Sequence, residues 1–247
     1  MPLPTYDAQR TTMSVFDALL QARRRFGGSK EILWDGNDDR KLTYDEVVRG
    51  AFALGHALKR MTAKGENVGV MLPSSAGAVV AFFALHAFGR IPAMLNFTAG
   101  EKALSAAIKL GGIKTVLTAK RFIELGKFEH LIEALKDDAA IVYLDDLREQ
   151  LTLGDKLTAV GGSKAPGLFK ARLKPSDTGV ILFTSGTEGD PKGVALSHQN
   201  ILANVEQVRC HIELYDNDIL FNPLPTFHCF GLTVGAILPM MLGVKEI

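Results

Sequence analysis

Short apolar runs of strand length alternate with segments of helical period over most of the chain. Residues 68–72 and 91–95 are nearly continuous apolar runs, and Ser74 or Ser75 begins a helical segment between them. Because strands that alternate with helices pair in parallel, the pattern predicts an α/β fold. We expect a mostly parallel, doubly wound sheet flanked by helices.

Several helical segments begin at a residue that is favoured as an N-cap, because its side-chain oxygen accepts a backbone hydrogen bond. These starts are Ser14 with Asp17, Thr43, Thr98 with Glu101, and Ser197. Residues 145–177 instead have polar runs and no sustained period, which predicts a connecting segment. We therefore divide the chain into an N-terminal α/β subdomain with its connecting segment (residues 1–170) and the start of a second α/β subdomain (residues 171–247).

A loop rich in glycine and hydroxyl groups lies between two apolar runs at residues 180–196. Glycine lets a backbone approach an anion, hydroxyl groups donate hydrogen bonds, and Lys192 adds a positive charge. The loop is predicted to be a hairpin that binds nucleotide phosphates, with a ligand-free glycine-rich hairpin as the alternative. Pro191 and Gly193 around the lysine exclude a Walker loop. The predicted phosphate-binding residues are Thr184, Ser185, Gly186, Thr187, Glu188, Gly189 and Lys192.

The composition is that of a globular protein and excludes several other classes. With 22% charged residues and a net charge of +1, the chain has no global field for nucleic acid. Cys210 and Cys229 form no metal-ligand pair with a histidine, so we predict no metal site built from protein ligands and a reducing, cytoplasmic location. The N-terminus has no secretory signal.

The run from residue 219 to 244 has no formal charge and is long enough to cross a bilayer. Its three prolines and its glycines disfavour a spanning helix. We expect a buried strand, a turn and a buried helix, with exposed apolar surface and self-association as a hazard.

Four segments resemble, in order, the motifs of the adenylate-forming superfamily of acyl-CoA synthetases, luciferases and peptide adenylation domains. They are residues 41–46, 88–93, 184–193 and 224–232. The resemblance implies ATP and Mg²⁺ as cofactors and conversion of a carboxylic acid to an acyl adenylate. It implies that the loop holds the β- and γ-phosphates, and that Lys192 neutralises charge on the departing pyrophosphate. His228 would wall the carboxylate pocket, although a histidine packed under an aromatic loop is the alternative.

Glu188 is the unusual residue of this loop, since many relatives have threonine there. A carboxylate beside a triphosphate is repelled unless it faces a cation or solvent. Our hypothesis is that Glu188 points away from the phosphates.

The segments 91–100, 183–189 and 201–207 are similar to the synthetase part of the bifunctional 2-acylglycerophosphoethanolamine acyltransferase/acyl-acyl-carrier-protein synthetases. This similarity implies a fatty acid as substrate and acyl carrier protein as acceptor, with CoA as the alternative acceptor. It also implies a link to lysophospholipid reacylation at the cytoplasmic face of the inner membrane in the full-length protein. Later family motifs have no counterpart before Ile247, so we expect an N-terminal part of a longer enzyme, without turnover.

Two other interpretations remain open. His211 and Asp216 have the His-x-x-x-x-Asp spacing that glycerolipid acyltransferases use for base-activated attack on a thioester. No glycine-rich acyltransferase block follows, and such a short pattern arises often by accident. The chain as a non-catalytic nucleotide-binding module is the second interpretation.

Overall fold

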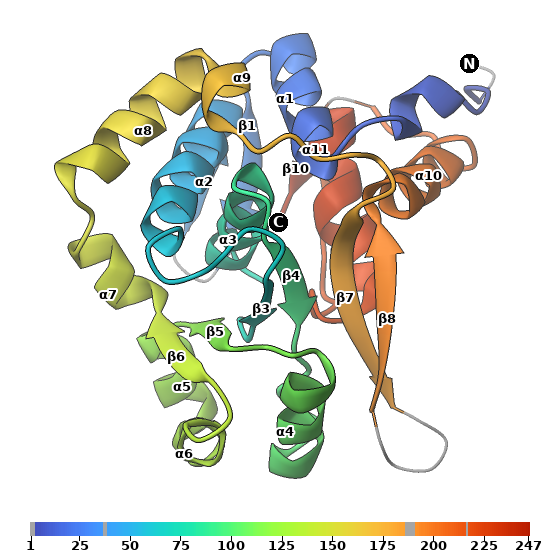
Figure 1. Cartoon of the computed structure of the whole chain (residues 1–247). Helices are drawn as coiled ribbons and strands as arrows, with labels where there is room; N and C mark the ends of the chain where they lie inside the picture. Colours follow the sequence, from blue (N-terminus) through green and yellow to red (C-terminus); the bar gives the residue numbers. More distant parts are fainter. Residues whose placement is uncertain (1–2, 37–38, 186–190, 216) are drawn as a thin grey trace.

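The computed structural model describes residues 3–36, 39–185, 191–215 and 217–247 (Figure 1). The helices are η1 (Ala8–Thr11), α1 (Val15–Phe26), α2 (Tyr44–Leu58), α3 (Ala76–Ala87), α4 (Glu101–Leu110), α5 (Lys120–Gly126), α6 (Glu129–Leu135), α7 (Leu144–Glu149), α8 (Leu153–Lys164), α9 (Pro166–Phe169), α10 (His198–Arg209), η2 (Gly231–Ile237) and α11 (Leu238–Leu242). The strands are β1 (Glu31–Asp35), β2 (Arg40–Thr43), β3 (Asn67–Val70), β4 (Ile91–Met94), β5 (Thr115–Thr118), β6 (Ala140–Tyr143), β7 (Thr178–Ser185), β8 (Pro191–Ser197), β9 (Ile219–Leu220) and β10 (Lys245–Glu246).

The strands form two mixed sheets. A six-stranded sheet has the order β6-β5-β3-β4-β7-β8, in which only β7 and β8 are antiparallel. A four-stranded sheet has the order β2-β1-β10-β9, in which only β1 and β2 are antiparallel. The predicted α/β fold with mostly parallel strands is confirmed, but two sheets replace the single sheet that we expected, because β1 pairs with β10 near the end of the chain.

Side chains of the six-stranded sheet alternate between two apolar cores, as the pleat of a strand requires. Val68 and Val70 of β3 join the larger core, which includes α1, α2 and α3, whereas Met71 and Val116 join the smaller core beneath α4 and α6. Helix α3 is buried on nearly all sides, and it contacts α2, β4 and β1. A helix that is apolar all round can be stable only inside the molecule.

Most predicted helix starts are confirmed. Ser14, Thr43, Ser75 and Ser197 each accept a hydrogen bond from a backbone N–H in the first turn of their helix. The start at Thr98 is wrong. Its hydroxyl donates to Asn96 Oδ1 at 2.7 Å instead, and α4 begins after Gly100, whose φ of 85° suits glycine.

The predicted connecting segment contains the helices α7, α8 and α9, which its sequence pattern did not indicate. Helix α8 lacks a regular apolar stripe because glycine, rather than a large side chain, makes its packing surface. A Cβ added at Gly162 would lie 2.5 Å from the Phe52 ring of α2. Asp155 of α8 also pairs at 2.7 Å with Arg60, which follows the end of α2.

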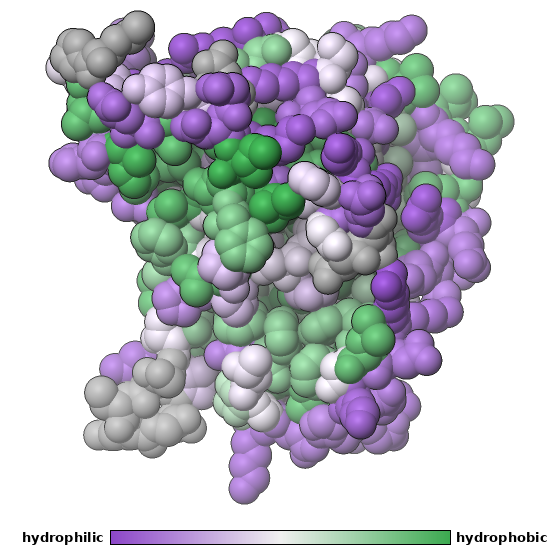
Figure 2. All heavy atoms as spheres, turned by 180° about the vertical axis from the view of Figure 1, so that it is seen from behind, coloured by the Kyte–Doolittle hydropathy of each residue, from purple (hydrophilic) through white to green (hydrophobic). Residues whose placement is uncertain are grey.

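The uncharged run at residues 219–244 forms β9, a turn, and the buried helical elements η2 and α11, which confirms the predicted order. The expectation that its strand is buried is wrong, because β9 is the edge strand of its sheet. No helix within the described residues is long and apolar enough to cross a membrane. Ile219 and Phe221 at the edge of the four-stranded sheet are 57% and 72% exposed. Seen from behind, the molecule presents a broad apolar area between hydrophilic margins (Figure 2), so the predicted exposed apolar surface is present.

Both sheets contain strands from either side of the predicted boundary between residues 170 and 171. In the six-stranded sheet β4 pairs with β7, and in the four-stranded sheet β1 pairs with β10. The division at this boundary stays a prediction.

Candidate functional site at the carboxyl edge of the sheet

The antiparallel hairpin of β7 and β8 carries the predicted phosphate-binding residues. Thr184 lies directly opposite Lys192, and Thr178 lies opposite Ser197 at the other end of the hairpin. Side chains of directly paired residues project from the same face of a hairpin. The hydroxyl of Thr184 and the ammonium of Lys192, both on exposed residues, are therefore neighbours on the hairpin. Figure 1 shows the hairpin of β7 and β8 at the end of the six-stranded sheet.

The structure does not test the other predicted phosphate-binding residues of this loop. Gly186, Thr187, Glu188 and Gly189 lie outside the described residues, and the side chain of Ser185 is not described either. Their phosphate-binding roles, and the hypothesis that Glu188 points away from the phosphates, stay predictions.

The rest of the molecule supports the hairpin. β7 pairs in parallel with β4, with Met94 opposite Leu182, and Val180 is buried in the larger core. Helix α4 packs against β8, where a Cβ added at Gly193 would lie 3.7 Å from Leu110 Cδ2. The described part of the hairpin is thus held by a strand on one side and by a helix near Gly193.

His228 lies in the turn between β9 and η2, and its side chain is exposed. Its backbone N–H donates to Pro225 O at 3.0 Å, and its carbonyl accepts from Leu232 N–H at 2.9 Å. These bonds fix the backbone at the start of η2 and leave the imidazole on the surface. The turn is therefore ordered by its main chain rather than by the histidine ring.

Two contacts place this turn over the ends of parallel strands. The Ser74 hydroxyl, just after β3, donates to Leu224 O at 3.0 Å. The rings of Phe97, just after β4, and Phe227 meet edge to face with centroids 4.9 Å apart. Sequence reasoning missed both contacts, since it considered Ser74 only as a helix cap and gave Phe97 no role.

The predicted residues that are described therefore belong to one edge of the sheet. Thr184 lies next to the last residue of β7, and the His228 turn lies over the carboxyl ends of β3 and β4, which are parallel to β7. In open α/β sheets, small ligands bind in the crevice beyond the carboxyl ends of the strands. This edge is the candidate active site.

The donors of the described hairpin fit a polyphosphate. A hydroxyl and an ammonium group both donate to phosphate oxygens, and Lys192 forms no ion pair with another described residue. Within the described residues, no three His, Cys, Asp or Glu side chains gather around a common point. Mg²⁺ usually binds through substrate phosphates and only one or two carboxylates, so this donor set is compatible with a magnesium nucleotide.

The acyltransferase pattern is only partly described. The imidazole Nδ1 of exposed His211 lies 2.7 Å from Gln207 O, one turn earlier in the chain. Asp216 lies outside the described residues. The described part of this pair therefore shows only a local contact at the end of α10.

The fold and the candidate site together define an α/β protein whose small-molecule site lies beyond the carboxyl ends of parallel strands. The family model of the AMP-binding enzymes matches residues 20–247, and the chain therefore belongs to the AMP-binding enzyme family. Ligases of this family use ATP with Mg²⁺.

Curated relatives are similar over most of this chain. An acyl-CoA ligase, sidI, of Beauveria bassiana (strain ARSEF 2860) is 28% identical over 92% of this chain and 40% of that protein. The long-chain-fatty-acid–CoA ligase of Bacillus subtilis (strain 168) is 27% identical over 100% of this chain and 47% of that protein. The chain thus spans less than half the length of these relatives.

Solved structures have the same fold. VinN in complex with 3-methylaspartate matches with a TM-score of 0.80 and 22% identity, over 95% of this chain and 61% of that one. A fatty acyl-adenylate ligase from L. pneumophila, in complex with acyl adenylate and pyrophosphate, matches with a TM-score of 0.75 and 22% identity, over 98% and 41%. The arrangement of the described residues is therefore that of the adenylate-forming fold.

Proposed function

We propose that the chain provides the phosphate-binding part of an ATP-dependent acid–thiol ligase that acts on a fatty acid. The observation that carries this proposal is the pairing of Thr184 with Lys192 at the carboxyl edge of the sheet. Family membership supports the reaction type, and the fatty-acid ligase among the relatives supports the acid. ATP supplies the adenylyl group that activates the carboxylate, and pyrophosphate is released.

Each residue of the candidate site has a distinct task in this proposal. The Thr184 hydroxyl donates to a phosphate oxygen, and Lys192 neutralises charge that develops on the departing pyrophosphate. The backbone amides at Gly186 and Gly189 and the hydroxyls of Ser185 and Thr187 complete the phosphate contacts. The exposed His228 ring lies at the same edge and forms a wall for the fatty-acid carboxylate.

The thiol acceptor is the finer part of the proposal. The segments 91–100, 183–189 and 201–207 favour the phosphopantetheine thiol of acyl carrier protein and a link to phospholipid reacylation. The names of the relatives favour CoA. A direct competition between CoA and holo-carrier protein for the acyl group, in an enzyme that contains this chain, decides between them.

We place the reaction in the cytoplasm, because Cys210 and Cys229 are both free thiols. In a reacylating enzyme that contains this chain, the site would face the cytoplasmic side of the inner membrane. Fractionation of cells that express the tagged protein tests this location.

The first experiment is isothermal titration of the chain with Mg-ATP, compared with Lys192→Ala. We expect saturable binding that weakens at least about tenfold in the variant, since a charge-assisted contact to phosphate is lost. Lys59→Ala, which removes an exposed lysine after the end of α2, is the matched control and should bind like the original chain. Equal affinity in all three proteins would contradict the phosphate-binding role of the hairpin.

A further inference from the structure

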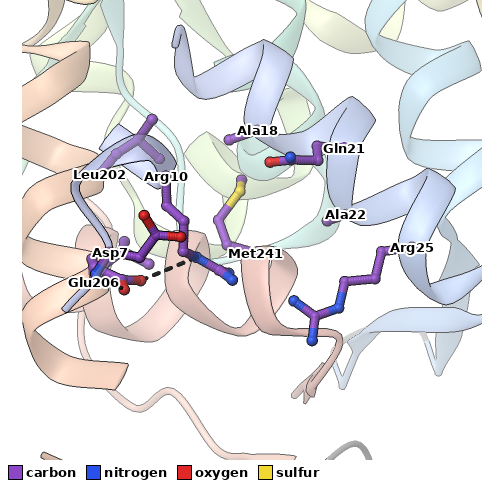
Figure 3. Close-up of a pocket in the computed structure, with 10 residues that line it drawn as sticks. Asp7, Arg10, Ala18, Gln21, Ala22, Arg25, Leu202, Glu206 and Met241 are labelled. Atoms are coloured by element: carbon purple, nitrogen blue, oxygen red, sulfur yellow. Dashed lines mark hydrogen bonds and ion pairs between the residues drawn. The ribbon is translucent and has the colours of Figure 1, made fainter. Parts of the chain in front are cut away.

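A second hollow lies at the opposite end of the hairpin from Lys192. It has a volume of about 270 Å³ and lies among η1, α1, α10 and α11 (Figure 3). Helix α10 begins directly after Ser197, which pairs with Thr178 at the end of the hairpin away from the tip. This cavity is therefore separate from the candidate active site.

One side of the cavity is apolar and the other is charged. The apolar lining consists of Ala18, Ala22, Leu202, Val205 and Met241. Arg10 of η1 and Arg25 of α1 extend their guanidinium groups toward the same space from two different elements (Figure 3). The same two arginines line a neighbouring hollow of about 580 Å³, so they stand where the two hollows meet.

The buried carboxylate of the cavity, Glu206, already has a full set of donors. It accepts the Asp7 backbone N–H at 2.8 Å and Arg209 Nε at 2.7 Å, and it pairs with Arg10 Nε at 3.1 Å. A carboxylate that is bound by two guanidinium groups has little capacity left for a third. Glu206 is therefore not a partner of Arg25.

Arg25 is the free cation of this cavity. Its guanidinium lies over the Phe26 ring, 5.1 Å from the centroid, and it forms no ion pair with any described residue. Burial lowers the pKa of Arg10; Glu206 raises it, and the guanidinium groups of Arg209 and Arg25 lower it again. Positive charge is thus crowded at this point.

The charged groups around the cavity indicate the charge of the ligand that it can bind. Glu206 pairs with Arg10 and Arg209, whereas the guanidinium of Arg25 pairs with no described carboxylate; Asp7 and Glu213 are the other carboxylates that line the two hollows. The carboxylates of Asp7 and Glu213 repel a second negative charge, so a monoanion fits better than phosphate. We propose that this cavity binds an aliphatic carboxylate, with its head group at Arg25 and Arg10 and its alkyl chain against Met241 and the alanines of α1.

Isothermal titration of the chain with acetate, butyrate, hexanoate and octanoate, without ATP, tests the proposal. Affinity should rise by about fourfold for each buried methylene until the cavity is filled. Arg25→Gln should weaken octanoate binding by about tenfold or more, because it removes a charge-assisted contact. Inorganic phosphate should bind more weakly than hexanoate.

Two further variants test whether octanoate binds in this cavity rather than elsewhere on the protein. Arg24→Gln removes the exposed arginine next in the same helix, which does not line the cavity, and should leave octanoate binding unchanged. Ala22→Leu fills part of the apolar side and should weaken octanoate binding but not acetate binding. Equal octanoate binding by the original chain and Arg25→Gln would overturn the proposal, as would an affinity independent of chain length.

The same titrations distinguish carboxylate binding in this cavity from binding at the hairpin. Lys192→Ala should retain octanoate binding that depends on Arg25, whatever its effect on ATP. Arg25→Gln should bind Mg-ATP like the original chain. If octanoate binding is lost in Lys192→Ala and kept in Arg25→Gln, the carboxylate binds at the candidate active site and the cavity proposal fails.

Discussion

At the scale of single residues, the most unusual ionisable group is Glu246 in the four-stranded sheet. Its side chain is 5% exposed, its Oε1 accepts from Asn222 Nδ2 at 3.4 Å, and its Oε2 has no partner among the described residues. Burial raises the pKa of Glu246 to about 8; Asn222 lowers it, and nearby Asp35 raises it. This carboxyl group is therefore largely protonated at neutral pH in the folded chain.

Glu246→Gln should stabilise the chain at pH 7. An unfolded glutamate ionises near its ordinary pKa of 4.5 and the folded one only near 8, so stability is lost as pH rises through this interval. The neutral amide of glutamine does not ionise, so the variant does not lose stability over this pH interval. We expect a gain of about 1–3 kcal/mol in the free energy of unfolding at pH 7 and almost none at pH 4. Urea unfolding at both pH values measures it.

Glu124→Gln, at an exposed site on α5, is the control and should change stability little at either pH. A gain for Glu246→Gln that is the same at pH 4 and pH 7 would mean that packing, rather than ionisation, is responsible.

The sequence located the candidate site at this scale but not its internal contacts. Thr184 and Lys192 were predicted because their chemistry suits phosphate, and a hairpin register then places them opposite each other. The contacts of Ser74 with Leu224 and of Phe97 with Phe227 depend on which strands are neighbours. Local pattern gives no information on that order, so these contacts were not predicted.

At the scale of helices and strands, glycine determines how closely α2 and α3 approach. A Cβ added at Gly55 of α2 would lie 2.5 Å from the carbonyl oxygen of Ala84 in α3. At Gly77, near the start of α3, the nearest atom would be Ser75 Oγ at 3.6 Å. The two glycines therefore have different reasons to be present, although both lie in helices.

Alanine at these two positions should have opposite effects. Gly77→Ala should stabilise the chain by about 0.5–1 kcal/mol, since alanine restricts the unfolded backbone and fits the available space. Gly55→Ala should destabilise it by about 1–3 kcal/mol, because backbone atoms of two helices must separate. Thermal unfolding followed by circular dichroism compares the two, and a similar change in both would refute the close-approach argument.

Elements with a regular apolar period were predicted well and the others were not. Thr43 and Ser197 cap helices with clear apolar faces, and both starts are confirmed. Helix α8 was missed because Gly161 and Gly162 supply its contact surface, where a period of large residues is normally sought. Helix packing through glycine is visible only once the partner, here Phe52, is known.

At the scale of the whole molecule, segments from the beginning and the end of the chain pack against each other. Leu33 in β1 pairs with Glu246 in β10, and the Tyr44 hydroxyl donates to Met240 O at 2.6 Å. Early and late segments thus depend on each other in the four-stranded sheet. The six-stranded sheet joins β4 to β7 in the same way.

We therefore expect the chain to unfold in one transition. Trp34, the single tryptophan, lies in β1 and reports on the four-stranded sheet, whereas far-ultraviolet circular dichroism reports on all helices. Urea midpoints from tryptophan fluorescence and from circular dichroism should coincide. Two separate midpoints would instead favour independent subdomains at residues 1–170 and 171–247.

Helix α3, buried on nearly all sides, has a consequence for how the chain reaches its native state. Until α2, β1 and β4 are all in place, part of the apolar surface of α3 is exposed to water. During this interval this surface can join the same segment of another molecule. Recovery from denaturant should therefore be more complete in dilute than in concentrated solution, and a chaperone that shields short apolar helices should assist it.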